Sequence, residues 1–325
     1  MALPVFIALQ RAAITLLLTG LLAGCATPEV MVPDDLQPGR LQPPDTHLNI
    51  AGLGPCTDSL DRTLRFDASQ PLHVLVHGCF GSSGQFRALA QVLAFHGQQA
   101  ACFTYDDRAK LNDSATELRQ ALKQLVDGSR LPQLTVIGHS QGALIARKSL
   151  TASLAGPLPE RAVDLRLVTV SGPFAGIESA RTCGKVWLYP VSLGLLPLSC
   201  YAVTGPKWTD ITYSSRFIRE PGQLAPQVGN YLKIDTDERG SCRREEAGRC
   251  VESDDIFSLD EQRHPVVEAD ARTKRVLVPA GHVEIVGDKR VAPTKLIEVL
   301  QAEGVLRLTS PTQASAFERL LARLY

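Results

Sequence analysis

From residue 72 onward, short runs with the composition of β-strands alternate with segments that have the periodicity of α-helices. The expected strands are residues 72–76, 101–105, 134–137, 164–170, 231–234 and 275–278. The expected helices are residues 86–96, a helix that begins at the capping-box pattern Ser114-Ala-Thr-Glu117, and residues 141–150. Strands that alternate with helices build a mainly parallel sheet with helices on both faces, because parallel strands need crossover connections. The pattern therefore predicts an α/β fold.

The third expected strand runs directly into Gly138-His139-Ser140-Gln141-Gly142, and a helical pattern follows at once. The glycines allow a close approach of backbones, and the serine lies in a strained turn before the N-terminus of a helix, which favours developing negative charge. This segment resembles the nucleophile elbow, G-x-S-x-G, of the α/β hydrolases. The resemblance implies an α/β-hydrolase fold and a serine hydrolase similar to esterases and lipases, with Ser140 as the nucleophile.

A second motif, His77-Gly78-Cys79-Phe80-Gly81, follows the first expected strand. It resembles the loop that supplies half of the oxyanion hole in α/β-hydrolase lipases. By that resemblance the backbone N–H groups of Cys79 and Gln141 are the two oxyanion donors. We expect His77 to hold this loop in place rather than take part in the chemistry.

A third motif, Pro279-Ala280-Gly281-His282, follows the last expected strand. In the α/β hydrolases the nucleophile, the acid and the histidine occur in that order along the chain, which implies that His282 is the catalytic histidine. His264 is the main rival, but it precedes the final strand.

The acid of the triad is expected between the strand at 231–234 and His282. The aspartates in this region are Asp235, Asp237, Asp254, Asp255 and Asp260. The segment Asp254-Asp255-Ile256-Phe257 resembles the D-x-[VI]-[VF] stretch in which the family often carries its acid. The resemblance implies Asp254, with Asp255 as the alternative, and leaves Asp235 and Asp237 open.

The N-terminal 24 residues have the features of a signal peptide. Arg11 is their one charged residue, and an apolar run over residues 12–23 is too short to span a bilayer as a helix. The run ends in Leu22-Ala23-Gly24-Cys25, which resembles the lipobox of bacterial lipoproteins. The resemblance implies cleavage before Cys25, lipidation of that cysteine and anchoring in the cell envelope, with Ala26 favouring the outer membrane facing the periplasm. The alternative is an ordinary secretory signal in which Cys25 has no role.

The domain organisation follows from proline and apolar content. Residues 27–45 hold five prolines, so we expect residues 25–50 to be the lipidated cysteine and an extended tether. The hydrolase domain is expected over residues 51–325, with an inserted cap at about 177–230. An uncharged stretch at 186–206 either lines an acyl pocket or buries its leucines against the core; both interpretations stay open.

The chain has eight cysteines. In an oxidising compartment the cysteines other than Cys25 are expected to form the disulfides Cys242–Cys250, Cys183–Cys200 and Cys56–Cys102, which leaves Cys79 free. The sequence alone does not establish this connectivity.

We therefore expect hydrolysis of a small-molecule or lipid acyl ester through an acyl-enzyme. An acyltransferase or thioesterase with the same triad and a non-catalytic envelope lipoprotein are the alternatives. No metal-ligand spacing, P-loop or G-x-G-x-x-G pattern occurs, so no cofactor or metal is expected. Lys and Arg number 34, as do Asp and Glu, so the charge gives no reason to expect nucleic acid. The oligomeric state stays open.

Overall fold

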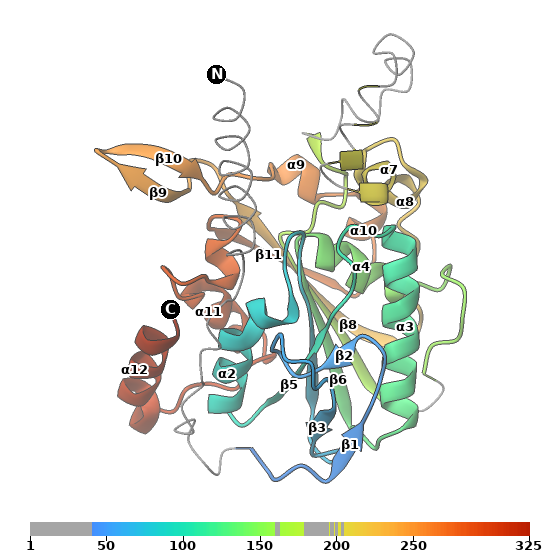
Figure 1. Ribbon diagram of the computed structural model, residues 1–325, viewed down its shortest axis with the longest axis vertical. Coiled ribbons are helices and arrows are strands. Elements are labelled where there is room, and N and C mark those ends of the chain that lie inside the picture. The colour runs from blue at the N-terminus through green and yellow to red at the C-terminus, as the bar shows by residue number, and fades with distance from the viewer. Residues whose placement is uncertain (1–40, 160–162, 179–194, 196–197, 199–200, 203–204) are drawn as a thin grey trace, which may run out of the picture. The chain divides into compact units, whose positions relative to one another are not determined.

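The structure of the protein is a computed structural model that describes residues 41–159, 163–178, 195, 198, 201–202 and 205–325. Its centre is a seven-stranded sheet with the strand order β11-β8-β7-β6-β4-β5-β2 (Figure 1). The strands are β2 (Leu53–Gly54), β4 (Leu72–Val76), β5 (Gln99–Phe103), β6 (Gln133–His139), β7 (Asp164–Val170), β8 (Val228–Asp237) and β11 (Thr273–Pro279). Every pairing is parallel except that of β2 with β5.

Helices cover both faces of this sheet. In Figure 1, α2 (Arg87–Phe95), α11 (Thr294–Ala302) and α12 (Ala314–Leu324) lie on one side, and α3 (Leu111–Asp127) and α4 (Gln141–Ser149) lie on the other. The mainly parallel sheet, its antiparallel edge strand β2 and the strand–turn–helix that joins β6 to α4 are the arrangement of the α/β-hydrolase fold. The predicted fold class is confirmed.

Burial explains why the central elements form where they do. All five residues of β4 are buried, as expected for a strand that is covered by helices on both faces. Helix α3 buries Leu111, Leu118, Leu122 and Leu125, which recur at the spacing of one helical face. The core therefore lies between the sheet and its two helical layers.

The expected capping box at Ser114 is wrong. Helix α3 begins at Leu111, and Ser114 is a buried residue of its first turn. The backbone N–H of Leu111 instead donates to Oδ2 of Asp210, 2.8 Å away. A carboxylate that is distant in the sequence thus caps the helix. The residues around the start of the helix do not predict such a contact.

Strand β8 is longer than expected, because it runs to Asp237 rather than to Ile234. Charged residues in a central strand hid this extension. Lys233 and Asp235 form a buried ion pair, and Lys233 also lies 3.1 Å from Glu268. The pairing lets these groups occupy the interior. The strand therefore ends at Asp237, directly before Glu238.

The expected tether extends too far into the domain. Strand β1 (Thr46–Leu48) pairs antiparallel with β3 (Leu64–Phe66), and Ile50 is buried in the core. Residues 46–50 therefore belong to the domain. The apolar side chain of Ile50 gains more from burial there than from exposure in a solvated tether.

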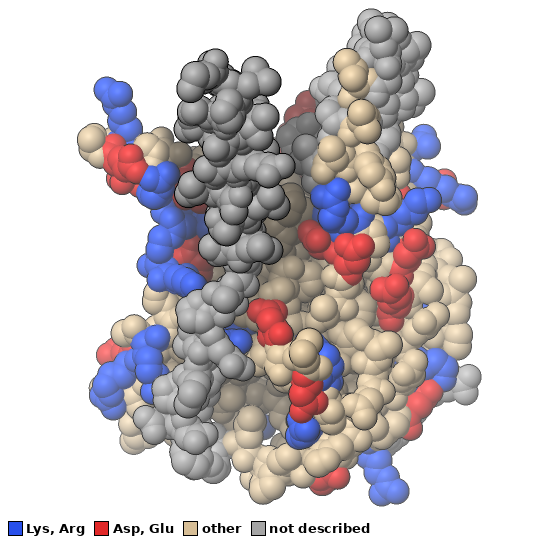
Figure 2. Space-filling view, viewed as in Figure 1, with Lys and Arg blue, Asp and Glu red and all other residues tan. Residues whose placement is uncertain are grey.

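The remaining elements are short. They are the 3-10 helices η1 (Ser83–Phe86), η3 (Gly205–Lys207), η4 (Glu284–Val286) and η5 (Pro311–Gln313), the helices α7 (Trp208–Ile211), α8 (Arg216–Arg219), α9 (Leu259–Gln262) and α10 (Pro265–Glu268), and the strands β9 (Cys242–Glu246) and β10 (Arg249–Ser253). Strands β9 and β10 form a hairpin that projects from the domain in Figure 1. Basic and acidic side chains are interspersed on the face shown in Figure 2.

Two of the three expected disulfides, Cys56–Cys102 and Cys242–Cys250, are present, and Cys79 is a free cysteine. Cys25, the pair Cys183 and Cys200, the signal peptide and most of residues 186–206 lie outside the described residues. No helix in the described ranges is long and apolar enough to cross a membrane.

Candidate active site

Ser140 lies in the tight turn between β6 and α4, at the carboxyl edge of the sheet. Its backbone has φ +56° and ψ −125°, a left-handed conformation that is costly for a residue with a side chain. Its N–H donates to the carbonyl of Val170 at the end of the neighbouring strand, 2.9 Å away. This is the geometry expected of a nucleophile elbow.

The glycines of the elbow are required by close backbone contacts. A Cβ at Gly142 would lie 2.2 Å from the carbonyl oxygen of Val76, and one at Gly138 would lie 2.3 Å from that of Gly142. A Cβ at Gly78 would lie 3.0 Å from Cβ of Ser140. The loop after β4 and the start of α4 can therefore approach Ser140 only because these positions lack side chains.

The loop after β4 places Cys79 beside the elbow. Within the described part of the chain, the backbone N–H groups of Cys79 and Gln141 donate to no other group. Phe80 has φ +57°, and its N–H donates to Oδ2 of Asp107 at 2.6 Å. The two amides expected to form the oxyanion hole are thus free of partners, and the loop that carries one of them is held by Asp107.

His77 holds this loop through a hydrogen bond and a stacked ring. Nδ1 of its buried ring lies 2.9 Å from the carbonyl of Gly78, and the ring stacks on Tyr105 at 4.3 Å between centroids. The Tyr105 hydroxyl donates to the carbonyl of His77. Burial lowers the pKa of His77, so the ring is a neutral structural group.

His282 follows β11 and is buried beside the elbow. Its ring packs edge-on against Phe257, and its centroid lies 4.8 Å from the ring centroid of His139, the residue before Ser140. Nε2 of His139 also lies 2.9 Å from the carbonyl of His282. His139 therefore joins the loop of the serine to the loop of the histidine. Burial and the neighbouring His282 lower the pKa of His139 to about 3, so it is neutral there.

The carboxylate that contacts the His282 ring is Glu238. Its Oε1 lies 2.9 Å from Nδ1 of His282, and its side chain is fully buried. Because a carboxylate can only accept, the shared proton lies on Nδ1, and Nε2 keeps the lone pair that a general base needs. The expectation that Asp254 or Asp255 holds this ring is corrected by the geometry.

Five hydrogen bonds converge on the Glu238 carboxylate. Oε1 accepts from the hydroxyls of Ser171 at 2.7 Å and Thr236 at 2.8 Å as well as from His282, and Oε2 accepts from the N–H groups of Ile256 and Phe257, each at 2.8 Å. Burial by itself raises the pKa of Glu238, but the hydrogen bond and charge of His282 and the other donors outweigh it and lower the pKa. Glu238 is thus ionised at neutral pH.

Asp254 holds the histidine loop rather than the histidine ring. Its carboxylate accepts from the N–H groups of Val283 and Glu284 at 3.0–3.1 Å, and its carbonyl accepts from the N–H of His282. A Cβ at Gly281 would lie 2.1 Å from Oδ2 of Asp254, so the glycine lets the loop pass over the carboxylate. Asp254 therefore caps the turn that carries His282.

The other aspartates are placed away from the ring. Asp235 pairs with the buried Lys233, Asp237 pairs with Arg239, and Asp255 and Asp260 are exposed. The sequence pattern did not indicate Glu238, because the expected strand ended at Ile234, three residues before its end at Asp237, and the candidate acids were all aspartates. The available signal was its place one residue after the true end of β8, on the carboxyl edge shared with Ser140.

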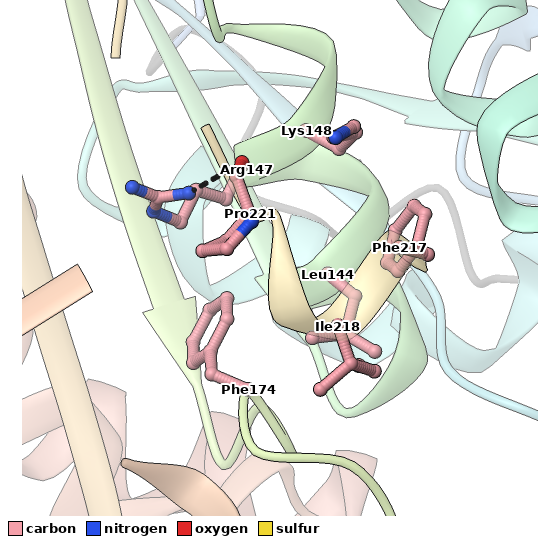
Figure 3. A pocket seen from close by; sticks show the side chains of 7 residues that line it. All are labelled: Leu144, Arg147, Lys148, Phe174, Phe217, Ile218 and Pro221. Carbon is pink, nitrogen blue, oxygen red and sulfur yellow. Dashed lines mark hydrogen bonds between the residues drawn. The ribbon is translucent and has the colours of Figure 1, made fainter. Parts of the chain in front are cut away.

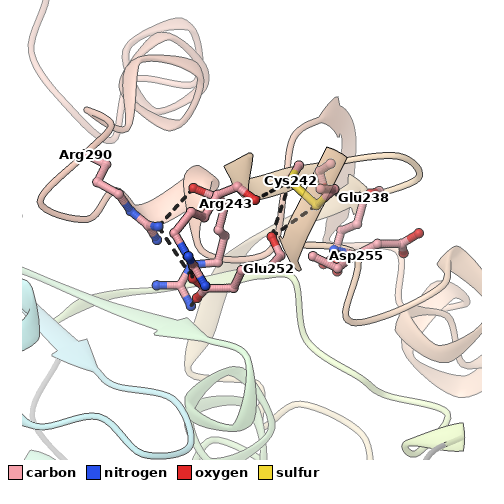
Figure 4. Close-up of a disulfide and its surroundings, with 10 residues drawn as sticks. Glu238, Cys242, Arg243, Glu252, Asp255 and Arg290 are labelled. Carbon is pink, nitrogen blue, oxygen red and sulfur yellow. Dashed lines mark hydrogen bonds and ion pairs between the residues drawn. A yellow bond between two sulfur atoms is a disulfide. The ribbon is translucent and has the colours of Figure 1, made fainter. Parts of the chain in front are cut away.

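The β9–β10 hairpin arises between Glu238 and Asp254 (Figure 4). The N–H of Ser241 donates to the carbonyl of Glu238, and the N–H of Asp254 donates to the carbonyl of Ser241, so the base of the hairpin is closed. Arg243 pairs with Glu252 at 2.9 Å, and the disulfide Cys242–Cys250 crosses the hairpin. The cysteine-bounded hairpin therefore lies between the carboxylate that contacts His282 and the carboxylate that caps its loop.

A small pocket that is partly open to solvent lies between α4 and α8. Its lining residues, drawn in Figure 3, are Leu144, Arg147, Lys148, Phe174, Phe217, Ile218 and Pro221. None of the residues gathered around Ser140 and His282 lines it, so it is separate from the candidate active site. Among the described residues, no group of three His, Cys, Asp or Glu side chains could hold a metal ion.

No family model and no curated protein matches this chain. Similar solved structures include the mature form of lipase BlEst2 from Bacillus licheniformis, at 16% identity over 80% of this chain and 98% of that chain, with a TM-score of 0.49. Esterase B from Lactobacillus rhamnosis shares 12% identity over 87% of this chain and 89% of its own, with a TM-score of 0.48. Esterase Pf2001 from Pyrococcus furiosus shares 16% identity over 84% and 93%, with a TM-score of 0.45. The strand order and the elbow, rather than these similarities, identify the fold.

Proposed function

We propose that the protein is a serine hydrolase that cleaves carboxylic esters. Ser140 is the nucleophile, and His282 is the general base and acid. Glu238 orients the imidazole and stabilises the imidazolium. The backbone N–H groups of Cys79 and Gln141 form the oxyanion hole. Glu238 replaces Asp254 as the acid of the triad.

The observation that carries the proposal is the joint placement of a strained serine and a buried histidine–glutamate pair. Ser140 has φ +56° in the elbow, and Glu238 lies 2.9 Å from Nδ1 of His282. His139 links the two loops through the carbonyl of His282. A strained backbone and a buried carboxylate both carry a cost in stability, which is characteristic of a catalytic site.

The first half-reaction forms an acyl-enzyme. Nε2 of His282 takes the proton of the Ser140 hydroxyl while Oγ bonds to the ester carbonyl carbon, and the carbonyl oxygen becomes an oxyanion that the two amides stabilise. Glu238 stabilises the imidazolium formed in this step. The oxyanion then collapses, the ester C–O bond breaks, and His282 gives its proton to the departing alkoxide.

The second half-reaction repeats these steps with water. His282 takes a proton from water as its oxygen bonds to the acyl carbon, and the same oxyanion donors stabilise the second tetrahedral species. The bond to Oγ of Ser140 then breaks and the serine recovers its proton. The products are a carboxylic acid and the free enzyme.

The test is covalent labelling with a fluorophosphonate probe together with turnover of p-nitrophenyl esters. We expect wild type to be labelled at Ser140 and to hydrolyse the esters, and Ser140→Ala to do neither. Ser153→Ala, a change outside the elbow, is the matched control and should behave as wild type. A wild-type protein that is folded but neither labelled nor active contradicts the proposal and favours a non-catalytic binding protein.

Product analysis separates hydrolysis from the acyltransferase and thioesterase alternatives. The protein is supplied with an acyl ester, an acyl thioester and an alcohol acceptor in one buffer. We expect free carboxylic acid from the ester as the main product. Preferential cleavage of the thioester, or transfer of the acyl group to the alcohol, contradicts ester hydrolysis as the principal reaction.

We also propose that the chain is a lipoprotein of the cell envelope, anchored through Cys25 and located at the outer membrane facing the periplasm. The support is the sequence Leu22-Ala23-Gly24-Cys25 after an apolar run. Wild type should incorporate a palmitate analogue and fractionate with the outer membrane, whereas Cys25→Ala should lose the label. Equal labelling of both proteins contradicts the proposal.

A further inference from the structure

Lys207, the last residue of η3, carries a buried amino group next to the oxyanion loop. Its residue exposure is 1%. Nζ donates to the backbone carbonyl of Asp107, lies 2.9 Å from Sγ of Cys79 and lies 3.6 Å from Oδ2 of Asp107. An ammonium group is removed from water only where polar partners replace its hydration, and here those partners all belong to residues 79 and 107.

Both partners of Lys207 connect to the proposed oxyanion donors. Cys79 supplies one donor itself. Oδ2 of Asp107 accepts from the N–H of Phe80 at 2.6 Å, and the carbonyl of Asp107 accepts from the side chain of Gln141, which supplies the other donor, at 3.1 Å. The Asp107–Lys207 pair thus touches the residues on both sides of the oxyanion hole.

The oxyanion loop needs an external support of this kind. Phe80 has φ +57°, a conformation that is unfavourable for a residue with a side chain. Its side chain is 78% exposed, so packing does little to hold it. Its N–H is held by the hydrogen bond to Asp107, and the Lys207 ammonium lies 5.5 Å from the centroid of the Phe80 ring.

Lys207 reaches this position from the insertion between β7 and β8. The N–H of Lys207 donates to the carbonyl of Arg108 at 3.3 Å. Gly205 has φ +72°, and a Cβ there would lie 2.8 Å from Cβ of Arg108. The backbone of η3 is therefore packed tightly against the loop after β5, and this packing directs the Lys207 side chain toward Cys79.

We propose that Lys207 is a positioning residue for the oxyanion hole: by bridging Asp107 and Cys79 it holds the Cys79 amide in the orientation that stabilises the tetrahedral oxyanion. The inference rests on the proposed function. It makes the packing of η3 against the loop after β5 a condition for efficient turnover, because η3 supplies the residue that holds the oxyanion loop.

The experiment compares wild type with Lys207→Met, which keeps an unbranched chain and removes the charge and its hydrogen bonds. Fluorophosphonate titration counts the competent sites, and kcat and KM are measured per titrated site with a short-chain p-nitrophenyl ester. We expect kcat to fall about tenfold to a hundredfold while KM changes less than about threefold, because the lost interaction acts on the transition state. The affinity for a trifluoromethyl ketone, which binds as an oxyanion adduct, should fall by a similar factor to kcat/KM.

Lys233→Met is the matched control. Lys233 is also 1% exposed and ion-paired, but its partners are Asp235 and Glu268 rather than the oxyanion loop. We expect this variant to lose thermal stability while its kcat per titrated site stays within about twofold of wild type. Equal losses of kcat in the two variants show a general effect of removing a buried lysine and overturn the proposal.

The remaining outcomes are also decisive. Wild-type kcat per site in Lys207→Met, or a rise in KM alone, overturns the positioning role. If Lys207→Met does not fold, Asp107→Asn tests the same bridge from its other side and should lower kcat and trifluoromethyl ketone affinity together; unchanged values overturn the proposal. A wild-type protein that does not react with the fluorophosphonate contradicts the proposed function itself, and with it this inference.

Discussion

Oε1 of Glu238 lies 2.9 Å from Nδ1 of His282, and neither group reaches solvent freely. The two residues follow neighbouring parallel strands, β8 and β11, whose carboxyl ends lie at the same edge of the sheet. The glutamate is ionised and fully hydrogen-bonded, so it can hold the imidazole in one tautomer and one orientation. Asp254 instead accepts hydrogen bonds from the backbone N–H groups of His282 and of the two residues that follow it.

The first prediction separates these two carboxylates. Glu238→Gln should lower kcat by about 10³–10⁴, because the imidazolium loses its charge partner and the tautomer is no longer enforced. Asp254→Asn should lower the free energy of unfolding by about 1–2 kcal/mol, because its oxygens cap backbone N–H groups. It should lower kcat much less than Glu238→Gln does. The measurements are kcat per fluorophosphonate-titrated site and urea denaturation. Asp255→Asn is the exposed control, and a larger loss of kcat in Asp254→Asn than in Glu238→Gln contradicts the assignment.

A second prediction concerns pH and His139. The folded-state pKa of His139 is lowered to about 3 from an ordinary value of 6.5, so below pH 6.5 the unfolded chain binds a proton that the folded chain does not. Stability should therefore fall as pH decreases from 6.5 towards 3, by up to about 1.4 kcal/mol per pH unit from this group. His139→Gln should show a shallower fall in urea denaturation between pH 7 and pH 4.5. Identical slopes for the two proteins contradict the prediction.

The third prediction addresses the elbow glycines. Gly142→Ala should destabilise the protein by about 3 kcal/mol or more, because the new Cβ would lie 2.2 Å and 2.4 Å from the carbonyl oxygens of Val76 and His77. Gly229→Ala is the matched control, since the nearest atom to its Cβ would be 3.9 Å away. The control should be neutral or more stable by about 0.5 kcal/mol. Thermal unfolding checks both, and a stable Gly142→Ala protein refutes the contact argument.

The fourth prediction ranks the two described disulfides. Cys56–Cys102 closes a separation of 46 residues and Cys242–Cys250 one of 8. Loop-closure entropy then predicts a loss of about 4 kcal/mol for Cys56→Ala with Cys102→Ala, against about 2.6 kcal/mol for Cys242→Ala with Cys250→Ala. Denaturation of the two double variants measures the difference. The reverse order would show that contacts in the folded state, rather than chain entropy, dominate.

The parts of the site that were predictable have local sequence patterns. The elbow around Ser140 needs two glycines at fixed spacing between a strand and a helix, and the histidine lies in a loop just after the last strand. The cysteine count suggested three pairs and a free Cys79 but did not establish the connectivity, for which the structure shows Cys56–Cys102 and Cys242–Cys250. The elbow and the histidine loop are determined by neighbours in the chain, whereas the pairing of the cysteines is not.

The acid was not predictable in this way. Several carboxylates follow β8, and which of them reaches His282 depends on where that strand ends and on the path of the hairpin that follows. The charged residues Asp235 and Asp237 gave the last three residues of the strand the composition of a loop. A family pattern then pointed to Asp254, which lies close to the histidine loop but faces its backbone.

The sequence by itself determined the α/β fold class, the nucleophile elbow and the loop of the histidine, because strand and helix periodicity and glycine spacing act over a few residues. Only the tertiary structure decided that Glu238 is the partner of His282, that Asp210 caps α3, and that Lys207 lies under the oxyanion loop. These three contacts join residues between 44 and 128 positions apart. In each contact a buried or partly buried polar group gains the partner that replaces its hydration, and that partner is defined only once the fold has brought the segments together.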